Sequence, residues 1–296
     1  MQLTVDGKTV EAKKGQSLRE LVCGLGLDRE QLSQRPLAAR IAGEVFTLNY
    51  IPLRDKDGEG DRPSMRRAMA ASGGNIRLLR IKDSAGRDVY VRTGQFVVFL
   101  ALRQLWPEAV STMDCTLGSS AFISVAGAKD FSVSRLKAQV EQIVAQDIPL
   151  LRHRAKKEEA IARFAAEGQG DKARLLQWRS LEYCSEYSYG DYTDNFYGEM
   201  APSTGYLSVW DILPADGGFL FVYPDELEPD RPAKLSPMPQ FFSVFSEGER
   251  WCRLMNCENV ADLNELTASG KIRELIRVNE ALHEKRFSEI ADRIVD

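Results

Sequence analysis

The fold of this chain is decided at its start, by residues 2–25, which read QLTVDGKTVEAKKGQSLRELVCGL. Apolar and polar residues alternate from Leu3 to Val10 around the turn dipeptide Asp6-Gly7, and this pattern is typical of a β-hairpin. Ser17 then opens a helical spacing of leucine and valine residues, and Glu20 follows it as in a helix-capping box. The stretch predicts a hairpin followed directly by a short helix.

The rest of the N-terminal part supplies more strand candidates. Short apolar runs lie at 37–41, 45–48 and 76–81. Between residues 53 and 75 the chain becomes polar and rich in glycine, which predicts a mobile insertion. Hairpin, helix and further strands in this order are the arrangement of a small ubiquitin-like β-grasp roll. We therefore expect an α+β fold that begins with such a domain over residues 1–83.

A second domain is expected over residues 84–235. Apolar residues at helical spacing run from 97 to 105, where Pro107 ends the pattern, and the clearest amphipathic helix spans 133–144. After two shorter predicted helices, the chain is rich in aromatic residues and glycine from Tyr183 to Trp210. Helices mixed with strand candidates predict an α/β domain here.

The last part, residues 236–296, is predicted to be helical and is preceded by a proline-rich segment. Its best helix runs from about 271 to 294, with isoleucine, leucine and phenylalanine on one face. This helix reaches the end of the sequence without a capping residue. We therefore expect the natural protein to continue beyond residue 296.

The composition is that of a soluble globular protein, with 44% hydrophobic and 28% charged residues. No apolar run approaches the roughly 18 residues that a membrane span needs, and the N-terminus has no secretory signal. The five cysteines are scattered and form no CxxC pair, which argues against a disulfide framework or a zinc site. We expect a cytoplasmic protein without membrane contact.

The charge pattern leaves RNA contact open as an alternative. The net charge of −4 gives no global basic surface for nucleic acid. A local basic cluster that could contact RNA consists of Arg62, Arg66, Arg67, Arg77, Arg80 and Lys82. A second basic run, at 152–157, is interpreted as a solvated face, with anion contact as its alternative.

Two stretches resemble a known family. Arg103-Gln104-Leu105-Trp106-Pro107, after a helix, resembles the start of the second accessory domain of threonyl-tRNA synthetase. The first 83 residues, with Ile41-Ala42-Gly43, resemble the TGS domain that precedes it there. The resemblance implies a β-grasp domain followed by an editing-type α/β domain of the threonyl/alanyl-tRNA synthetase kind. In that family the second domain hydrolyses mischarged seryl-tRNA.

Two other stretches are more similar to a kinase-fused relative of the synthetase. They are Phe196-Tyr197-Gly198 with residues 202–207, and residues 279–285 with Ile290-Ala291-Asp292. This likeness implies a non-catalytic regulatory or ligand-binding N-terminal module of a uridine-kinase-like nucleoside kinase. Residues 236–296 would then be a helical connector towards a P-loop kinase domain. ATP and Mg²⁺ would belong to that absent domain, and no cofactor is expected in this chain.

The resemblance also locates the editing site, and the residues there differ from the family's. The family uses an HxxxH pair and a CxxxH pair to bind and activate water. Aligned on residues 105–107, the first pair becomes Arg92 and Phe96. Aligned on Pro202, the second pair becomes Phe196 and Met200. The chain has only two histidines, His153 and His283, and neither falls in these motifs.

Other catalytic motifs fail as well. A P-loop needs GxxxxGK[ST] to cradle phosphates, and the nearest string, Ser269-Gly270-Lys271-Ile272, lacks both the upstream glycine and the downstream hydroxyl. We interpret it as a turn before a helix. No metal-ligand spacing is present. We therefore expect no catalytic residues in this chain, and a diverged aminoacyl-tRNA deacylase remains the enzymatic alternative.

What remains is a possible pocket at the former editing site. It could take a nucleoside, a nucleotide or another small anionic ligand, with a base stacked on aromatic rings and Arg92 meeting a phosphate or carboxylate. The alternative is that the aromatic residues fill the site as core and that Arg92 pairs with Asp191 or Asp194. The expected pocket residues are Arg92, Phe96, Phe196, Met200, Tyr197 and Tyr206.

Overall fold

The computed structural model describes residues 2–29, 31–52, 68–236 and 239–295. The chain divides into two compact units, residues 1–154 with 185–235, and residues 155–184 with 236–296. Each unit contains both early and late parts of the sequence. The expected α+β fold is confirmed, whereas the division at 83 and 235 stays a prediction. The expected insertion at 53–75 lies mostly outside the described residues.

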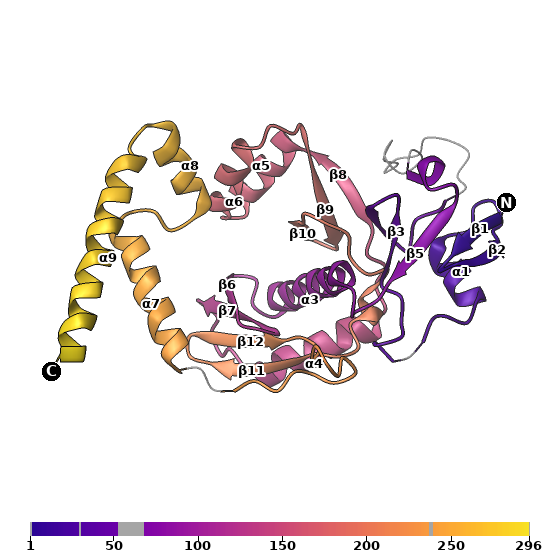
Figure 1. Ribbon diagram of the computed structural model, residues 1–296, viewed down its shortest axis with the longest axis horizontal. Coiled ribbons are helices and arrows are strands. Elements are labelled where there is room, and N and C mark those ends of the chain that lie inside the picture. Colours follow the sequence, from indigo (N-terminus) through magenta and orange to yellow (C-terminus); the bar gives the residue numbers. More distant parts are fainter. Residues whose placement is uncertain (1, 30, 53–67, 237–238, 296) are drawn as a thin grey trace. The chain divides into compact units, whose positions relative to one another are not determined.

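The first unit begins with a five-stranded sheet in the order β2-β1-β5-β3-β4 (Figure 1). β1 and β5 run parallel, and the other neighbours run antiparallel. The β1–β2 turn has φ values of 46° at Asp6 and 78° at Gly7, which a two-residue hairpin loop requires. The elements are β1 (Gln2–Val5), β2 (Lys8–Glu11), α1 (Leu18–Gly24), β3 (Ala38–Ile41), β4 (Glu44–Thr47) and β5 (Asn75–Leu79).

The capping box predicted at the start of α1 is present. The Ser17 hydroxyl accepts from the Glu20 backbone N–H at 3.2 Å, and the Glu20 carboxylate accepts from the Ser17 backbone N–H at 2.7 Å. These two bonds satisfy backbone donors that a helix start otherwise leaves unpaired. The Glu20 carboxylate accepts hydrogen bonds from the Ser17 backbone N–H and from the Ser17 hydroxyl, and these two bonds lower the pKa of Glu20. Sequence and structure therefore agree on how α1 begins.

The first unit continues with a four-stranded antiparallel sheet in the order β11-β12-β7-β6. Two helices, α3 (Ser84–Leu105) and α4 (Val133–Ala145), lie side by side along it (Figure 1). α3 begins at Ser84, earlier than the 97–105 stretch that the apolar spacing indicated. The strands are β6 (Val110–Thr116), β7 (Ser120–Ala126), β11 (Asp211–Ala215) and β12 (Gly218–Val222).

A three-stranded sheet in the order β10-β9-β8 and the short 3-10 helix η1 complete the region around α3. These elements are β8 (Arg152–Lys156), β9 (Tyr183–Tyr189), β10 (Tyr192–Asn195) and η1 (Thr204–Tyr206). α3 contacts both β10 and η1. The loop between β10 and η1 contains Phe196 and Met200, two of the expected pocket residues.

The two parts of the first unit share one continuous apolar core. Asn49, in the β-grasp part, donates to the carbonyl oxygens of Pro202 at 2.8 Å and Leu150 at 3.3 Å. Arg35 stacks over the ring of Tyr206, with its guanidinium carbon 3.7 Å from the ring centroid. Buried side chains and directional polar contacts therefore join the β-grasp part to the rest of this unit.

The second unit is helical and has a small core of its own. Arg174 on α6 forms ion pairs with Asp262 at 2.8 Å and Glu265 at 3.2 Å, both on α8. These contacts explain why residues 155–184 group with the C-terminal helices. The helices are α5 (Lys157–Ala166), α6 (Gly170–Gln177), α7 (Pro239–Leu254), α8 (Val260–Ala268) and α9 (Ile272–Val295). None of the described helices of the chain is long and apolar enough to cross a membrane.

Candidate functional site

The structure brings together the two segments that the sequence placed at the former editing site. Phe96 lies on α3, and Phe196 lies just after β10, with their ring centroids 6.2 Å apart. The ring of Phe96 also lies 5.4 Å from that of Tyr192 and 6.4 Å from that of Tyr187. These separations are those of packed aromatic pairs. The four rings form what we call the aromatic cluster: Phe96, Tyr187, Tyr192 and Phe196.

Burial shows how completely this cluster is filled. Phe96 and Met200 are both 0% exposed, and Tyr187 is 1% exposed. A side chain without exposed surface has protein atoms on all sides, so a ligand cannot reach it without displacing them. Phe96 and Met200 therefore pack as core residues. This packing matches the alternative in which aromatic side chains fill the site.

Arg92 lies next to the cluster and is held by the backbone. Its Nε donates to the carbonyl oxygen of Glu199 at 2.9 Å. Its guanidinium also lies so close to Gly198 that a Cβ added there would stand 2.6 Å from Cζ. The carboxylate of Asp194 accepts a hydrogen bond from the Tyr192 hydroxyl at 3.1 Å. A peptide carbonyl thus takes the place expected for a carboxylate.

The two tyrosines expected in the pocket lie in very different surroundings. Tyr197 is 65% exposed, whereas Tyr206 is 1% exposed. Tyr206 lies under Arg35 and has Arg19 with its guanidinium carbon 5.4 Å from the ring centroid. Burial, reinforced by the charge of Asp28, raises the pKa of Tyr206. Its contacts assign Tyr206 to the junction with the β-grasp part.

A polar network beside the cluster was missed by sequence reasoning. Arg152 on β8 donates to the buried carboxylate of Glu199 at 2.7 Å and also to the Ser185 hydroxyl. The Tyr187 hydroxyl donates to the carbonyl oxygen of Gly198 at 3.1 Å and accepts from the Met200 backbone N–H at 3.2 Å. These bonds fix the 196–200 loop against β8 and β9. We call them the Arg152–Glu199 network.

The two histidines are not arranged for nucleophilic catalysis. His153 Nε2 lies 3.2 Å from the Ser188 hydroxyl and 3.6 Å from the buried carboxylate of Glu186. A Ser-His-acid triad needs the acid on one ring nitrogen and the serine on the other, and here both are at Nε2. His283 lies on α9, with its ring 4.5 Å from that of Phe287. The described residues also contain no group of three potential metal ligands.

The basic cluster proposed for RNA contact is only partly described. Arg77 pairs with Asp83 at 2.7 Å, and Arg80 pairs with Asp6 at 3.1 Å. Lys82 is exposed. Arg62, Arg66 and Arg67 lie outside the described residues. Two of the three described cations therefore already have carboxylate partners.

Comparisons with known proteins point to the synthetase family. No protein-family model matches the chain. The threonine–tRNA ligase of Symbiobacterium thermophilum is 26% identical over 218 residues, covering 72% of this chain and 30% of the ligase. That of Clostridium kluyveri is 22% identical over 218 residues, with 72% and 31% covered. That of Carboxydothermus hydrogenoformans is 26% identical over 154 residues, with 50% and 24% covered.

The chain spans about 30% of the length of the first of these relatives. The match is distant in identity but extends over most of this chain. It agrees with the mixed α+β fold and with the resemblance carried by residues 103–107. The chain therefore contains a threonyl-tRNA synthetase-like region.

Proposed function

We propose that this chain is a non-catalytic accessory module of the threonyl-tRNA synthetase type, which acts by binding or regulation and not by hydrolysis. The observation that carries the proposal is the position of Phe96. Where the resembling family places a histidine, this chain has a phenylalanine that is 0% exposed and packed against three other aromatic rings. Such a position can hold neither a general base nor a water molecule.

The chemistry of ester hydrolysis supports the same conclusion. A deacylase needs a base within hydrogen-bond reach of a water beside the ester. Arg92, Phe96, Phe196 and Met200 include no group that accepts a proton at neutral pH. The Arg152–Glu199 network also holds the 196–200 loop against the sheet. A site of this composition favours packing over water activation.

The enzymatic alternative is tested directly by deacylation of seryl-tRNA. The purified chain should release serine no faster than buffer alone, because the aligned site has no base. The heat-denatured chain serves as a control for contaminating activity. Turnover that disappears in both His153→Ala and His283→Ala would identify an active site elsewhere and overturn the non-catalytic proposal. Turnover that survives both substitutions would point to a contaminating hydrolase. A second purification identifies the contaminant if the activity then separates from the chain.

A finer part of the proposal concerns a ligand at the exposed edge of the cluster. Tyr197 is 65% exposed and precedes Gly198, against which the guanidinium of the partly buried Arg92 lies. A nucleoside, a nucleotide or another small anion could stack on Tyr197 and meet the Arg92 guanidinium without entering the closed core. Support for this subsite comes from these two residues alone. This subsite makes the proposed function more specific. If the subsite does not bind a ligand, the non-catalytic proposal still stands.

The subsite is tested by titrating the chain with common nucleosides and nucleotides in a calorimeter. Arg92→Gln should weaken binding about tenfold or more, because a charge-assisted hydrogen bond is lost. Arg77→Gln is the matched control, since Arg77 is an exposed arginine paired with Asp83. Its affinity should equal that of the unaltered chain. If no titrant gives saturable binding, the subsite is abandoned and the non-catalytic proposal stands.

We also propose that the module regulates a uridine-kinase-like partner domain. Support comes from the resemblance of residues 196–207 and 279–292, whereas the relatives described above are threonine–tRNA ligases. An RNA-binding role is the remaining candidate. Of the described cations of its basic cluster, Arg77 and Arg80 already pair with Asp83 and Asp6, and Lys82 is exposed, which gives this role less support.

A further inference from the structure

Two of the five cysteines lie on either side of the turn that ends α7, in the second unit. Asn256, in this turn, has a φ of 51°, which is the left-handed conformation at which many helices end. The backbone N–H of Cys257 donates to the carbonyl oxygen of Cys252 at 3.0 Å. Inside this bond, the backbone N–H of Asn256 donates to the carbonyl oxygen of Arg253 at 3.1 Å. Two nested bonds of this kind form a Schellman motif.

The Schellman motif decides which side chains face each other. In an uninterrupted helix, residues five apart point about 140° away from each other around the axis. The left-handed residue turns the chain back, and the two residues joined by the outer bond of the motif commonly have their side chains in contact. Here those two residues are Cys252 and Cys257, and both are half-buried free thiols. The end of α7 therefore holds a dithiol at a position where an apolar pair is usual.

The start of α8 holds Cys257 from the other side. The Asp262 carboxylate accepts from the backbone N–H groups of Glu258 at 2.9 Å and Asn259 at 3.1 Å. The Asn259 side chain in turn accepts from the Asp262 backbone N–H at 3.1 Å. Cys257 thus lies between two hydrogen-bonded helix caps. The backbone on both sides of it is fixed, which keeps its thiol next to that of Cys252.

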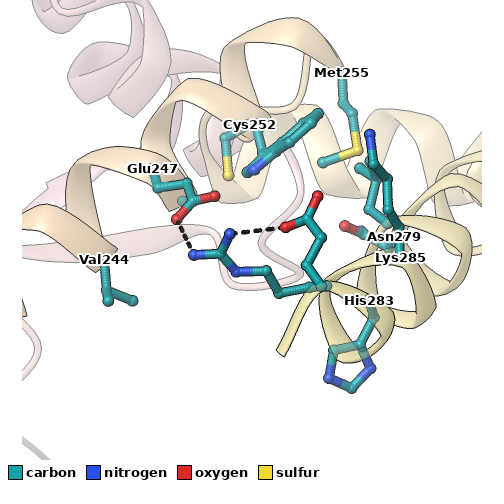
Figure 2. Close-up of a pocket in the computed structure, with 12 residues that line it drawn as sticks. Val244, Glu247, Cys252, Met255, Asn279, His283 and Lys285 are labelled. Atoms are coloured by element: carbon teal, nitrogen blue, oxygen red, sulfur yellow. Dashed lines mark hydrogen bonds and ion pairs between the residues drawn. The ribbon is translucent and has the colours of Figure 1, made fainter. Parts of the chain in front are cut away.

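The surroundings of the two thiols differ. Burial, the charge of Asp262 and the neighbouring Cys252 raise the pKa of Cys257, so this cysteine remains a protonated thiol at neutral pH. Cys252 lies on the α7 wall of a pocket between α7 and α9 that encloses about 610 Å³ (Figure 2). Pockets of this size admit small molecules. Cys252 is therefore the thiol that a small reagent meets first.

We propose that Cys252 and Cys257 are a modification site, at which a low-molecular-weight disulfide such as oxidised glutathione converts the two thiols into a reversible disulfide. Cys252 loses its proton, attacks one sulfur of the reagent and releases one reduced thiol molecule. Cys257 then loses its proton, attacks the Cys252 sulfur and displaces the second. The two cysteines give up two electrons and two protons in total, and the reagent takes up both. The inference does not depend on the proposed function.

Two neighbouring thiols can also bind a metal ion. A structural zinc ion takes four protein ligands, and a catalytic one takes three. The residues that the structure describes contain no group of three potential ligands, so the pair has no third donor beside it. Oxidation needs only the two sulfurs. The disulfide would join the last turn of α7 to the segment before α8 and change one wall of the pocket.

Peptide mapping of the full chain tests the proposal. The chain is equilibrated with reduced and oxidised glutathione, its remaining thiols are alkylated, and it is digested with trypsin. Because trypsin cuts after Arg253, the two cysteines fall in separate peptides, residues 251–253 and 254–271. A disulfide between Cys252 and Cys257 joins these peptides into one species of summed mass. This species should form in the unaltered chain and separate when dithiothreitol is added.

Serine variants test the order of the two steps. Cys257→Ser should lose the linked species and retain Cys252 as a mixed disulfide with glutathione, because no second thiol displaces it. Cys252→Ser should also lose the linked species, and its mixed disulfide should form about tenfold more slowly, because the remaining thiol is the one with the raised pKa. Cys23→Ser is the matched control. Cys23 is an exposed thiol of the first unit, so the yield of the linked species should not change.

The unfolded chain shows how much the helix end contributes. The equilibrium constant for disulfide formation with glutathione should be at least about tenfold larger in the folded chain than in concentrated urea, because only the folded turn holds the two thiols together. Circular dichroism confirms that each variant folds. A folded chain without the linked species, equal constants in the two states, or a Cys252→Ser variant that reacts as fast as Cys257→Ser overturns the proposal.

Discussion

Replacement of Phe96 by alanine should lower the free energy of unfolding by about 3–5 kcal/mol, the range measured for large aromatic residues in packed cores. Phe96 is 0% exposed and contacts three other rings of the aromatic cluster. Truncation removes these contacts and leaves a cavity in the packed core beside α3. Urea unfolding followed by circular dichroism measures the loss, and hydrogen exchange of α3 amides locates it in the first unit.

The same experiment separates a filled site from an open pocket. Tyr197→Ala is the control, because Tyr197 is 65% exposed and its loss should change the free energy of unfolding by about 0.5 kcal/mol or less. If Phe96→Ala costs no more than Tyr197→Ala, the ring of Phe96 is not enclosed. The former editing site would then be an open cavity, and the packing argument behind the non-catalytic proposal would fail.

Much of the fold follows from local sequence patterns. The hairpin around Asp6-Gly7 and the capping box of Ser17 and Glu20 were predicted because each depends on residues close in sequence. The amphipathic spacing of residues 133–144 likewise predicted α4 almost to its ends. Such elements carry their own turn and capping signals. Tertiary contacts do not override those signals here.

Two elements were missed because distant contacts form them. No strand was predicted at the basic run 152–157, yet residues 152–156 form β8, which pairs with β9 and keeps His153, Arg154 and Lys156 exposed. The first half of α3 was missed because it contains Gly86 and Gly94, which lower helix propensity. A Cβ at Gly94 would lie 2.7 Å from the Phe221 ring, so glycine lets the helix approach the sheet. Neither reason is visible from local periodicity.

The candidate site was likewise half predictable. Alignment with the family's two editing motifs put Phe96 and Phe196 at one site, and the structure places the two rings next to each other. The alignment could not show that Phe96 is fully enclosed or that Tyr206 contacts Arg35. Packing density and the partners of an arginine are properties of the assembled core. Sequence spacing alone does not contain them.

The Arg152–Glu199 network shows most clearly what a linear pattern omits, and it gives the second large expected effect. The two residues are 47 apart in sequence, and the side chain of Glu199 is only 4% exposed. Arg152→Leu should lower the free energy of unfolding by about 3 kcal/mol, because it removes a cation that pairs with a buried carboxylate. Chemical denaturation measures the loss, and Arg77→Leu, which breaks the exposed pair with Asp83, should cost less than about 1 kcal/mol.

The double variant Arg152→Leu/Glu199→Leu identifies the cause of that loss. It should recover most of the stability lost in Arg152→Leu, since apolar residues of similar volume can replace a buried ion pair at little net cost. If the double variant is as unstable as the sum of the two single variants, the carboxylate is not the source of the penalty. A network that holds the 196–200 loop should also protect the Met200 amide, which donates to the Tyr187 hydroxyl. Faster hydrogen exchange at Met200 in Arg152→Leu would show that this pair closes the loop over the aromatic cluster, whereas unchanged exchange would assign the closure to Tyr187 alone.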